Sequence, residues 1–317
     1  MSKEFHQIVW DDQLCQQWRA ILRLAIREDL DQDGDWTTRA LVPEDAVGKA
    51  AVVAREPGIV AGLPGVETTL GEIEPRLCWS PEAEDGDTVR PGDRIGVIEG
   101  PARGILAAER ILLNLLGRLS GIATLTGKYV EAVAGTKARI YDTRKTTPGW
   151  RRLEKYAVRC GGGWNHRQGL FEAVLIKDNH LALGRGTSAK SPFPAEGPAR
   201  YTPAEAVARA RRFVEQRAAE PARSRMIVEI EVDTLWQLDE VLPAGPDIVL
   251  LDNMSPAELR EAVVRRDACS PAVELEASGG VTLETVGRIA AAGVDRISVG
   301  ALTHSAVCLD VGLDWLG

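Results

Sequence analysis

A chain of 317 residues with 44% hydrophobic and 26% charged residues has ordinary globular composition and is long enough for one large domain or two smaller ones. Its formal net charge of -8 excludes the global basic field that draws a protein onto nucleic acid irrespective of sequence. The five cysteines have no CxxC spacing and the four histidines are scattered. That pattern argues against a disulfide scaffold and a zinc cluster, and it predicts a reducing, cytoplasmic location.

The first part of the chain predicts a small domain of helices and short strands. Residues 12–29 have helical periodicity, and short apolar runs punctuated by Gly and Pro follow in GKAAVVAREPGIVAGLPG and DGDTVRPGDRIGVIEGP. Residues 105–135 then predict a long, mostly buried helix or helix pair. The apolar start of this stretch is too short and too charged to span a bilayer, and the N-terminus has no apolar signal region. We therefore expect no membrane partner.

After Thr136 the pattern changes to alternating strands and helices. Short β-branched runs occur in ARIYDTRK, EAVLIKDNH, MIVEIEVD, DIVLLDN, AVELEASGG and VDRISVG, and amphipathic segments separate most of them. Such alternation is typical of right-handed βαβ units around a parallel sheet. Six to seven units without a GxGxxG motif favour an α/β barrel over a doubly wound dinucleotide-binding sheet.

Almost every predicted strand ends in a residue that could bind a ligand or take part in catalysis. In an α/β barrel the site lies at the carboxyl ends of the strands, so these residues would meet at one rim. The alternative is that strands often end in polar loops, which explains a few of these cases but not all of them. The strand-end residues are Arg144, Lys145, Lys177, Glu231, Asp252, Ser278, Gly279 and Gly300.

Two consecutive glycine-containing strand ends, EASGG and VGALTHS, are candidates for a phosphate site. Glycine lets backbone N–H groups approach an anion, and a helix N-terminus adds partial positive charge. The alternative is a pair of ordinary turns. Their position late in the βα series favours phosphate binding.

Lys177 and the acidic strand ends have several possible roles. Lys177 could form a Schiff base, act as a fixed cation for an anionic substrate, or pair with Glu229, Glu231 or Asp252. Glu231 and Asp252 could bind sugar hydroxyls or Mg²⁺, directly or through water. For Glu229, which shares a strand face with Glu231, we favour a structural salt bridge.

Residues 141–167 gather seven Lys or Arg side chains and one His within an acidic chain. His166 follows three glycines and precedes Arg167, so we favour a role in the site, whereas His180 and His304 have weaker cases. Part of the basic helix that contains Arg151 and Lys155 is expected to be a solvated face. Residues 181–203 read as a loop, either a surface insertion or a mobile lid.

These motifs, taken together and in order, resemble the quinolinate phosphoribosyltransferase family. The resemblance covers nearly the whole chain, through REDLDQDGDWTT, ERILLNLLGRLSGIAT, DTRKTTPGWRRLEKYAVRCGGGWNHR, LIKDNH, EIEVD, LLDN, EASGG and VGALTHS. It implies an N-terminal α/β sandwich domain over residues 1–118, with residues 303–317 packing back on it, and an α/β barrel over 119–302. Segment 181–203 is longer than expected for the family.

The resemblance also implies the site residues. Catalytic roles fall to Lys145, Lys177, Glu231 and Asp252, and the last two would hold the metal, directly or through water. Substrate binding would involve Arg110, Thr143, Arg144, Lys145, His166, Arg167, Lys177, Glu231 and Asp252. The 5′-phosphate loops would be Ser278, Gly279, Gly280, Gly300 and Ala301. The family forms homodimers or larger assemblies, in which Arg110 would be contributed across the interface.

The implied reaction joins quinolinate to phosphoribosyl pyrophosphate with Mg²⁺, giving nicotinate mononucleotide, pyrophosphate and CO₂ for NAD biosynthesis. The clustered cations would bind the carboxylates and phosphates of the two substrates. Three alternatives are a Schiff-base lyase that uses Lys177, a relative acting on nicotinate, and a non-catalytic anion-binding protein.

Overall fold

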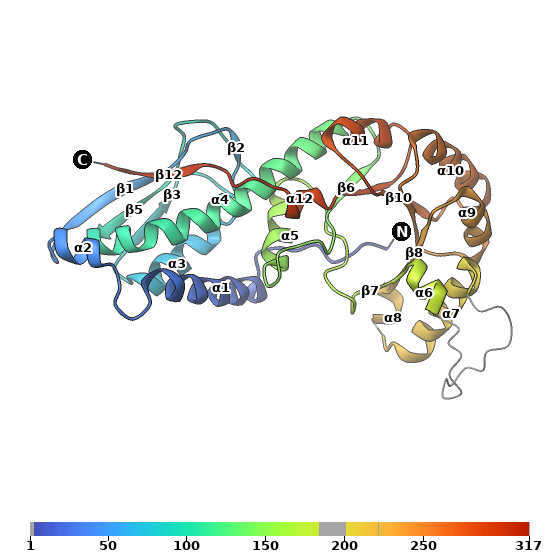
Figure 1. Ribbon diagram of the computed structural model, residues 1–317, viewed down its shortest axis with the longest axis horizontal. Coiled ribbons are helices and arrows are strands. Elements are labelled where there is room, and N and C mark those ends of the chain that lie inside the picture. Colours follow the sequence, from blue (N-terminus) through green and yellow to red (C-terminus); the bar gives the residue numbers. More distant parts are fainter. Residues whose placement is uncertain (1–2, 184–200, 221, 317) are drawn as a thin grey trace. The chain divides into compact units, whose positions relative to one another are not determined.

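The computed structural model describes residues 3–183, 201–220 and 222–316, and Figure 1 shows their helices and strands. Most of segment 181–203 lies outside the described residues. The choice between a surface insertion and a lid therefore stays a prediction.

The chain divides into two compact units, which we call the barrel unit and the N-terminal unit. The barrel unit comprises the described residues up to His6 together with Glu131–Arg144 and His166–Val299. The N-terminal unit comprises Gln7–Val130, Lys145–Asn165 and the described residues from Gly300 onward. The chain thus passes between the units several times.

The barrel unit is built on six parallel strands in the order β6-β11-β10-β9-β8-β7. This is the sequential order of an α/β barrel, with β11 returning to pair with β6. Within the described residues β6 and β7 are the two edges, so the cyclic order is broken between them. The predicted α/β barrel is confirmed, with six strands: β6 (Arg139–Tyr141), β7 (Ala173–Ile176), β8 (Ile227–Val232), β9 (Ile248–Asp252), β10 (Glu274–Ser278) and β11 (Arg296–Ser298).

Helices follow most of these strands, and several begin with capping boxes. In a capping box the N-cap side chain accepts from the backbone three residues on, and that residue's side chain accepts from the N-cap N–H. The pairs are Thr202 with Glu205, Thr234 with Gln237, Ser255 with Glu258 and Thr282 with Thr285. Figure 1 shows α9, α10 and α11 on the outer side of the strands. The segments are α6 (Asp178–Leu183), α7 (Pro203–Arg217), α8 (Ala222–Arg225), α9 (Leu235–Val241), η2 (Leu242–Ala244), α10 (Pro256–Cys269) and α11 (Leu283–Ala290).

The N-terminal unit contains a four-stranded antiparallel sheet in the order β12-β1-β5-β3. Its strands are β1 (Val47–Ala54), β3 (Cys78–Pro81), β5 (Arg94–Pro101) and β12 (Val311–Trp315), and a smaller sheet pairs β2 (Gly58–Ile59) with β4 (Thr88–Val89). Buried side chains of β1 and β5 pack with those of α3 and α4 in one apolar core. The helical segments are α1 (Asp12–Leu30), α2 (Trp36–Leu41), η1 (Leu63–Gly65), α3 (Val66–Ile73), α4 (Ala102–Ala132), α5 (Arg151–Cys160) and α12 (Ala301–His304).

The compact units divide the chain differently from the expected boundary at 118/119. Helix α4 runs through that position without interruption, as one 31-residue helix. The first described residues belong to the barrel unit, and residues 145–165 belong to the N-terminal unit. β12 pairs with β1, so the C-terminal residues complete the N-terminal sheet. Among the described helices, none is both long and apolar enough to cross a membrane.

Candidate active site

Four strands of the barrel unit carry polar residues at their carboxyl ends, which all lie at the same end of the barrel. Asp252 is the last residue of β9 and Ser278 the last of β10, and the two are paired in register. Glu231 lies one residue before the end of β8, opposite Leu250 of β9, and Lys177 directly follows β7. Because the strands are parallel, all of these groups lie at their carboxyl ends, where α/β barrels carry their sites.

Lys177 and Glu231 are in direct contact. The Lys177 ammonium forms an ion pair with Glu231 Oε2, and the side chains are 41% and 14% exposed. The backbone N–H of Lys177 donates to His180 Nδ1 at 2.9 Å, so His180 fixes the turn after β7. The pair therefore presents one cation and one carboxylate at the rim, within reach of solvent.

The ends of β9 and β10 are joined through Asn253, a residue that sequence reasoning did not single out. Its N–H donates to Ser278 O at 2.9 Å, and its side-chain amide donates to Asp252 Oδ2 at 2.7 Å. Gly279 has φ +91, and a Cβ there would lie 2.2 Å from Asn253 Oδ1. Glycine is therefore required for this close approach, whereas at Gly280 (φ +59) nothing lies within 4 Å of an added Cβ.

His166 is buried in the barrel unit, and protein groups contact both of its ring nitrogens. Nδ1 accepts the backbone N–H of Arg167 at 2.8 Å, and Nε2 lies 3.1 Å from Glu229 Oε2 and 3.5 Å from Glu276 Oε1. The His166 N–H donates to Asp142 Oδ1 at 2.9 Å. Since Nδ1 accepts, the neutral ring carries its proton on Nε2, directed at Glu229. Direct binding of an anion by His166 stays a prediction.

Glu229 and Glu276 are two fully buried carboxylates on β8 and β10. Burial raises the pKa of Glu276 to about 7, and while the His166 ring opposes this, the neighbouring charge of Glu229 adds to it. Glu229 contacts the neutral His166 ring, so this contact is a hydrogen bond, and the salt bridge that we favoured for Glu229 stays a prediction. Sequence reasoning missed Glu276, although its spacing from Ser278 places both on one face of β10.

His166, Glu229 and Glu276 also form, among the described residues, a group of three whose ligand atoms lie within 4.8 Å of one another. A metal ion there would need a lone pair on His166 Nε2. Because Nδ1 already accepts the Arg167 N–H, such binding would require loss of the Nε2 proton, giving an imidazolate. The geometry therefore favours a hydrogen-bonded histidine over a metal ligand at this position.

Arg167 and Arg144 bring like charges together. The Arg167 side chain is largely buried, and its Nη1 donates to Ala173 O at 3.1 Å. Burial lowers the pKa of Arg167, Glu229 opposes that shift, and the nearby Arg144 cation lowers the pKa further. The Arg144 charge therefore acts against that of Arg167, and a bound anion would offset this repulsion. The neighbouring Thr143 is half-buried.

Four of the expected site residues belong to the N-terminal unit: Lys145, Gly300, Ala301 and Arg110. An added Cβ at Gly300 would lie 3.0 Å from Lys145 Cδ and 3.1 Å from His304 Nε2, so these three residues are neighbours. Gly300 is the N-cap of α12, which begins at Ala301. The chain itself connects these residues to the barrel unit, since Lys145 follows Arg144 and Gly300 follows Val299. The fourth residue, Arg110, lies on α4.

The loop after Lys145 is organised by Glu154, which is fully buried and which sequence reasoning also missed. Its carboxylate accepts from Thr147 N at 3.1 Å, from Thr147 Oγ1 at 2.8 Å and from Arg118 Nη2 at 2.6 Å. The carbonyl of Lys145 accepts from Thr303 Oγ1 at 2.7 Å. Of the four basic residues on α5, some of which were expected on a solvated face, Lys155 is fully buried, whereas Arg151, Arg152 and Arg159 are half-buried.

Arg110 is exposed on α4. Its side chain is 66% exposed, and its contact with the neighbouring Glu109 is 4.0 Å long. A contact of that length at the surface holds the guanidinium weakly.

Comparisons with known proteins cover almost the whole chain. Residues 35–120 match the quinolinate phosphoribosyl transferase N-terminal domain, and residues 122–314 match the C-terminal domain of that family. The chain is 45% identical to nicotinate-nucleotide pyrophosphorylase [carboxylating] of Mycobacterium leprae, covering 93% of this chain and 96% of that protein. It is 38% identical to the probable enzyme of that name from Bacillus subtilis, covering 89% and 88%.

Solved structures show the same similarity. The nicotinate-nucleotide pyrophosphorylase of Francisella tularensis superposes with a TM-score of 0.84 at 34% identity, covering 99% of this chain and 100% of that one. The protein of that name from Ehrlichia chaffeensis gives a TM-score of 0.79 at 34% identity, covering 94% and 98%.

Proposed function

Because the chain belongs to the quinolinate phosphoribosyl transferase family, we propose that it transfers the phosphoribosyl group from phosphoribosyl pyrophosphate to quinolinate with loss of CO₂. The products are nicotinate mononucleotide and pyrophosphate, the former a precursor of NAD. The observation that carries the proposal is the ion pair between Lys177 and Glu231 at the carboxyl ends of β7 and β8, in the same sheet whose next strands end in Asp252 and Ser278.

The cations suit a substrate with two carboxylates. A guanidinium group can make two parallel hydrogen bonds to one carboxylate, which fixes the plane of the ring as well as its place. Arg167 is largely buried, so an anion bound to it would be screened little by water. Thr143 and Lys145 flank Arg144 in the chain and complete the proposed binding set, and His166 precedes Arg167.

The bonds change in two steps. The lone pair of the pyridine nitrogen attacks the anomeric carbon of the ribose as the bond to pyrophosphate breaks, so no base has to remove a proton from the nucleophile. Positive charge develops on the ribose, and the carboxylates of Glu231 and Asp252 stabilise it electrostatically. The C2–carboxylate bond then breaks, CO₂ leaves, and the electron pair stays on C2 beside the cationic nitrogen until a proton replaces it.

The phosphate ends of the sugar substrate suit the glycine loops. Ser278, Gly279 and Gly280 precede α11, and Gly300 and Ala301 form the start of α12. Such loops expose backbone N–H groups to an anion. The 5′-phosphate would bind there.

A divalent cation fits the donor chemistry of the rim. Carboxylate oxygens are the ligands that Mg²⁺ prefers, and Glu231 and Asp252 are both partly accessible at neighbouring strand ends. Glu231 and Asp252 would hold such an ion, directly or through water, and it would supply positive charge against the departing pyrophosphate.

The reaction is tested with purified protein, quinolinate, phosphoribosyl pyrophosphate and Mg²⁺, by following mononucleotide absorbance and labelled CO₂ from the 2-carboxylate. We expect both products in equal amounts, loss of turnover with a chelator, and recovery with Mg²⁺. Turnover of nicotinate without CO₂ would indicate a different pyridine substrate. Turnover of neither acid would contradict the proposal.

A Schiff-base lyase is not favoured. An ammonium held by the Glu231 carboxylate is a fixed cation, whereas a Schiff-base nucleophile must be the neutral amine. Borohydride treatment with substrate would trap a covalent adduct on Lys177 only if the lyase mechanism applied.

A homodimer would complete the site. The exposed Arg110 is held weakly within its own chain, which suits a residue that binds substrate in a neighbouring subunit. Mixing Arg110→Ala and Lys177→Ala chains should restore about a quarter of wild-type activity, because half of randomly formed dimers are hybrids with one intact site of two. Hybrid dimers that form but stay inactive would contradict a shared site.

A cytoplasmic location is also proposed. All five cysteines are free thiols, which suits a reducing compartment. Fractionation of cells that produce the protein, followed by immunodetection, would test this.

A further inference from the structure

The first described residues of the chain lie across the amino ends of the barrel strands, at the opposite end of the barrel from the rim. Lys3 Nζ donates to Met226 O at 2.7 Å and lies 3.5 Å from Asp247 Oδ1. The N–H of His6 donates to Glu172 Oε1 at 2.9 Å. Met226, Asp247 and Glu172 each directly precede a strand (β8, β9 and β7), so this N-terminal segment, residues 3–6, is fixed to three strand starts.

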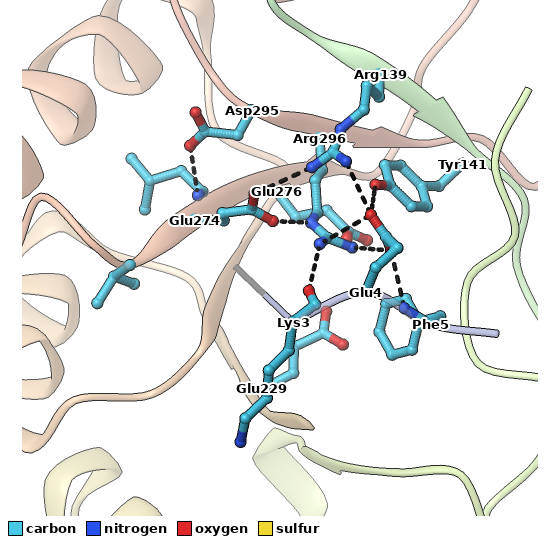
Figure 2. A network of polar contacts seen from close by, with 12 residues as sticks. Lys3, Glu4, Phe5, Arg139, Tyr141, Glu229, Glu274, Glu276, Asp295 and Arg296 are labelled. Carbon is cyan, nitrogen blue, oxygen red and sulfur yellow. Dashed lines mark hydrogen bonds and ion pairs between the residues drawn. The ribbon is translucent and has the colours of Figure 1, made fainter. Parts of the chain in front are cut away.

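Glu4 anchors the middle of the segment, as Figure 2 shows. Its carboxylate accepts from Tyr141 Oη at 2.8 Å, from Arg139 Nη1 at 2.8 Å and from Arg296 Nη1 at 3.1 Å. Arg296 is fully buried and also contacts Glu274. A buried guanidinium requires such carboxylate partners, so the position of Glu4 is strongly specified. The next residue, Phe5, is thereby fixed as well.

Phe5 is in direct contact with the His166 ring. It is 3% exposed, and the two rings are stacked with their centroids 4.3 Å apart and their planes at 28°. The His166 ring is thus held on one face by Phe5, at Nε2 by a hydrogen bond of 3.4 Å to Glu229 Oε1, and at Nδ1 by the Arg167 N–H. Glu276 Oε1 lies 3.5 Å from Nε2 and limits its position by contact. These contacts form a continuous series from the N-terminal segment to the backbone of Arg167.

The inward faces of the strands extend this series. Glu274, Glu276 and Ser278 alternate on β10, and Glu229 and Glu231 alternate on β8, so each set lies on one face. Each strand therefore carries acidic side chains on one face from its first half toward the rim, where a barrel of this size usually packs apolar layers. Burying a charged side chain in the interior costs free energy of folding unless the charge is paired and hydrogen-bonded, so an incompletely paired one suggests a functional role.

We infer that Phe5, Glu229 and Glu276 are positioning residues, which fix the His166 ring and, through Nδ1, the Arg167 backbone for binding a carboxylate of the pyridine substrate. This inference rests on the proposed function and deepens it. It assigns the N-terminal segment, far from the rim along the strands, a part in substrate affinity. None of the three residues has to touch the substrate.

Phe5→Leu is the first test, because leucine keeps an apolar side chain of useful volume but cannot stack. We expect KM for quinolinate to rise about 10-fold, with kcat and KM for phosphoribosyl pyrophosphate within about 2-fold of wild type. Phe5→Tyr keeps the ring and should restore the wild-type KM. Phe171→Leu is the matched control, since Phe171 is 79% exposed on the same unit. A fall in Tm with an unchanged KM in Phe5→Leu would overturn the inference.

Glu229→Met is the second test, because it replaces a buried charge by an apolar side chain of similar size. Removing one partner of a buried polar contact can also lower stability, so Tm is measured as well, and a purely structural role predicts a lower Tm with no change in KM. We expect KM for quinolinate to rise about 10-fold, since Nε2 loses its acceptor. An unchanged KM together with an unchanged Tm would count against the inference.

Imidazole ¹⁵N shifts give a readout that does not depend on turnover. We expect the His166 signals, identified by their loss in His166→Asn, to report the Nε2–H tautomer in the wild type and mixed tautomers in Glu229→Met. A Nδ1–H tautomer in the wild type would overturn the inference. Absent turnover of the wild-type protein would instead refute the proposed function, so the two failures are distinguishable.

Discussion

Replacing Lys177 with alanine is expected to lower kcat/KM by about 10²- to 10³-fold, the loss typical of removing one fixed charge or donor from a preorganised site. Lys177 directly follows β7, contacts Glu231 and keeps 41% of its side chain exposed at the rim. Its loss would remove a cation and would also leave Glu231 unbalanced beside two polyanionic substrates. Steady-state kinetics with each substrate varied in turn measures the effect.

Lys137→Ala is the matched control for Lys177→Ala. Lys137 has the same ammonium group and an ion pair of 2.7 Å, to Asp295, but it precedes β6 at the amino ends of the strands. Lys137 is 53% exposed and lies at the opposite end of the strands from the rim, so its loss should change kcat/KM by less than about 2-fold. A folded Lys177→Ala protein with kcat/KM near the wild-type value would show that Lys177 lies outside the working site.

The fold could be predicted because parallel barrels leave a periodic signature. Each strand is buried on both faces and reads as a short apolar run, and each is bounded by polar residues at its carboxyl end, as at Asp252 and Ser278. The break between β6 and β7 could not be predicted, because it depends on pairing between distant segments. Nor does local periodicity reveal that residues 3–6 join the barrel unit, since their contacts lie more than a hundred residues away.

Site residues could be predicted only where a charged or reactive side chain stands at the end of a predicted strand. Lys177 and Glu231 satisfied that rule, and the structure brings them into contact. Glu276 and Glu154 did not, because a charged residue inside a strand or helix looks the same in sequence whether it is buried or solvated. Burial of Glu276 follows from the faces of three neighbouring strands, and that of Glu154 from Arg118 on another helix.

Asn253 illustrates a second limit. Its left-handed backbone, with φ 54, and its bond to Ser278 O position the ends of two strands, yet nothing in LLDN distinguishes it from an ordinary polar turn. The role of Asn253 could be recognised only together with Gly279, because the close approach of Asn253 requires glycine at that position. Contacts of this kind join residues far apart in the chain and become visible only in three dimensions.

Gly279→Ala is expected to raise KM for phosphoribosyl pyrophosphate by about 10²-fold, since misplacing a binding loop by about 1 Å can cost that much. The added Cβ would lie 2.2 Å from Asn253 Oδ1 and 3.0 Å from the Asn253 backbone N, at φ +91. The strain should also cost about 1–3 kcal/mol of stability. Kinetics with the sugar substrate varied, together with Tm, measure both effects.

Gly280→Ala and a second-site change separate the clash from general loop damage. At Gly280 an added Cβ meets nothing within 4 Å, so only the positive φ of +59 is penalised, by about 1–2 kcal/mol. Adding Asn253→Gly to Gly279→Ala removes Oδ1 and tolerates the left-handed backbone, so part of the lost affinity should return. In a double-mutant cycle this appears as a favourable coupling of about 0.5–3 kcal/mol. If the losses of affinity in the cycle are additive, the contact between Asn253 and Gly279 does not shape the phosphate loop. Equal rises in KM for Gly279→Ala and Gly280→Ala would lead to the same conclusion.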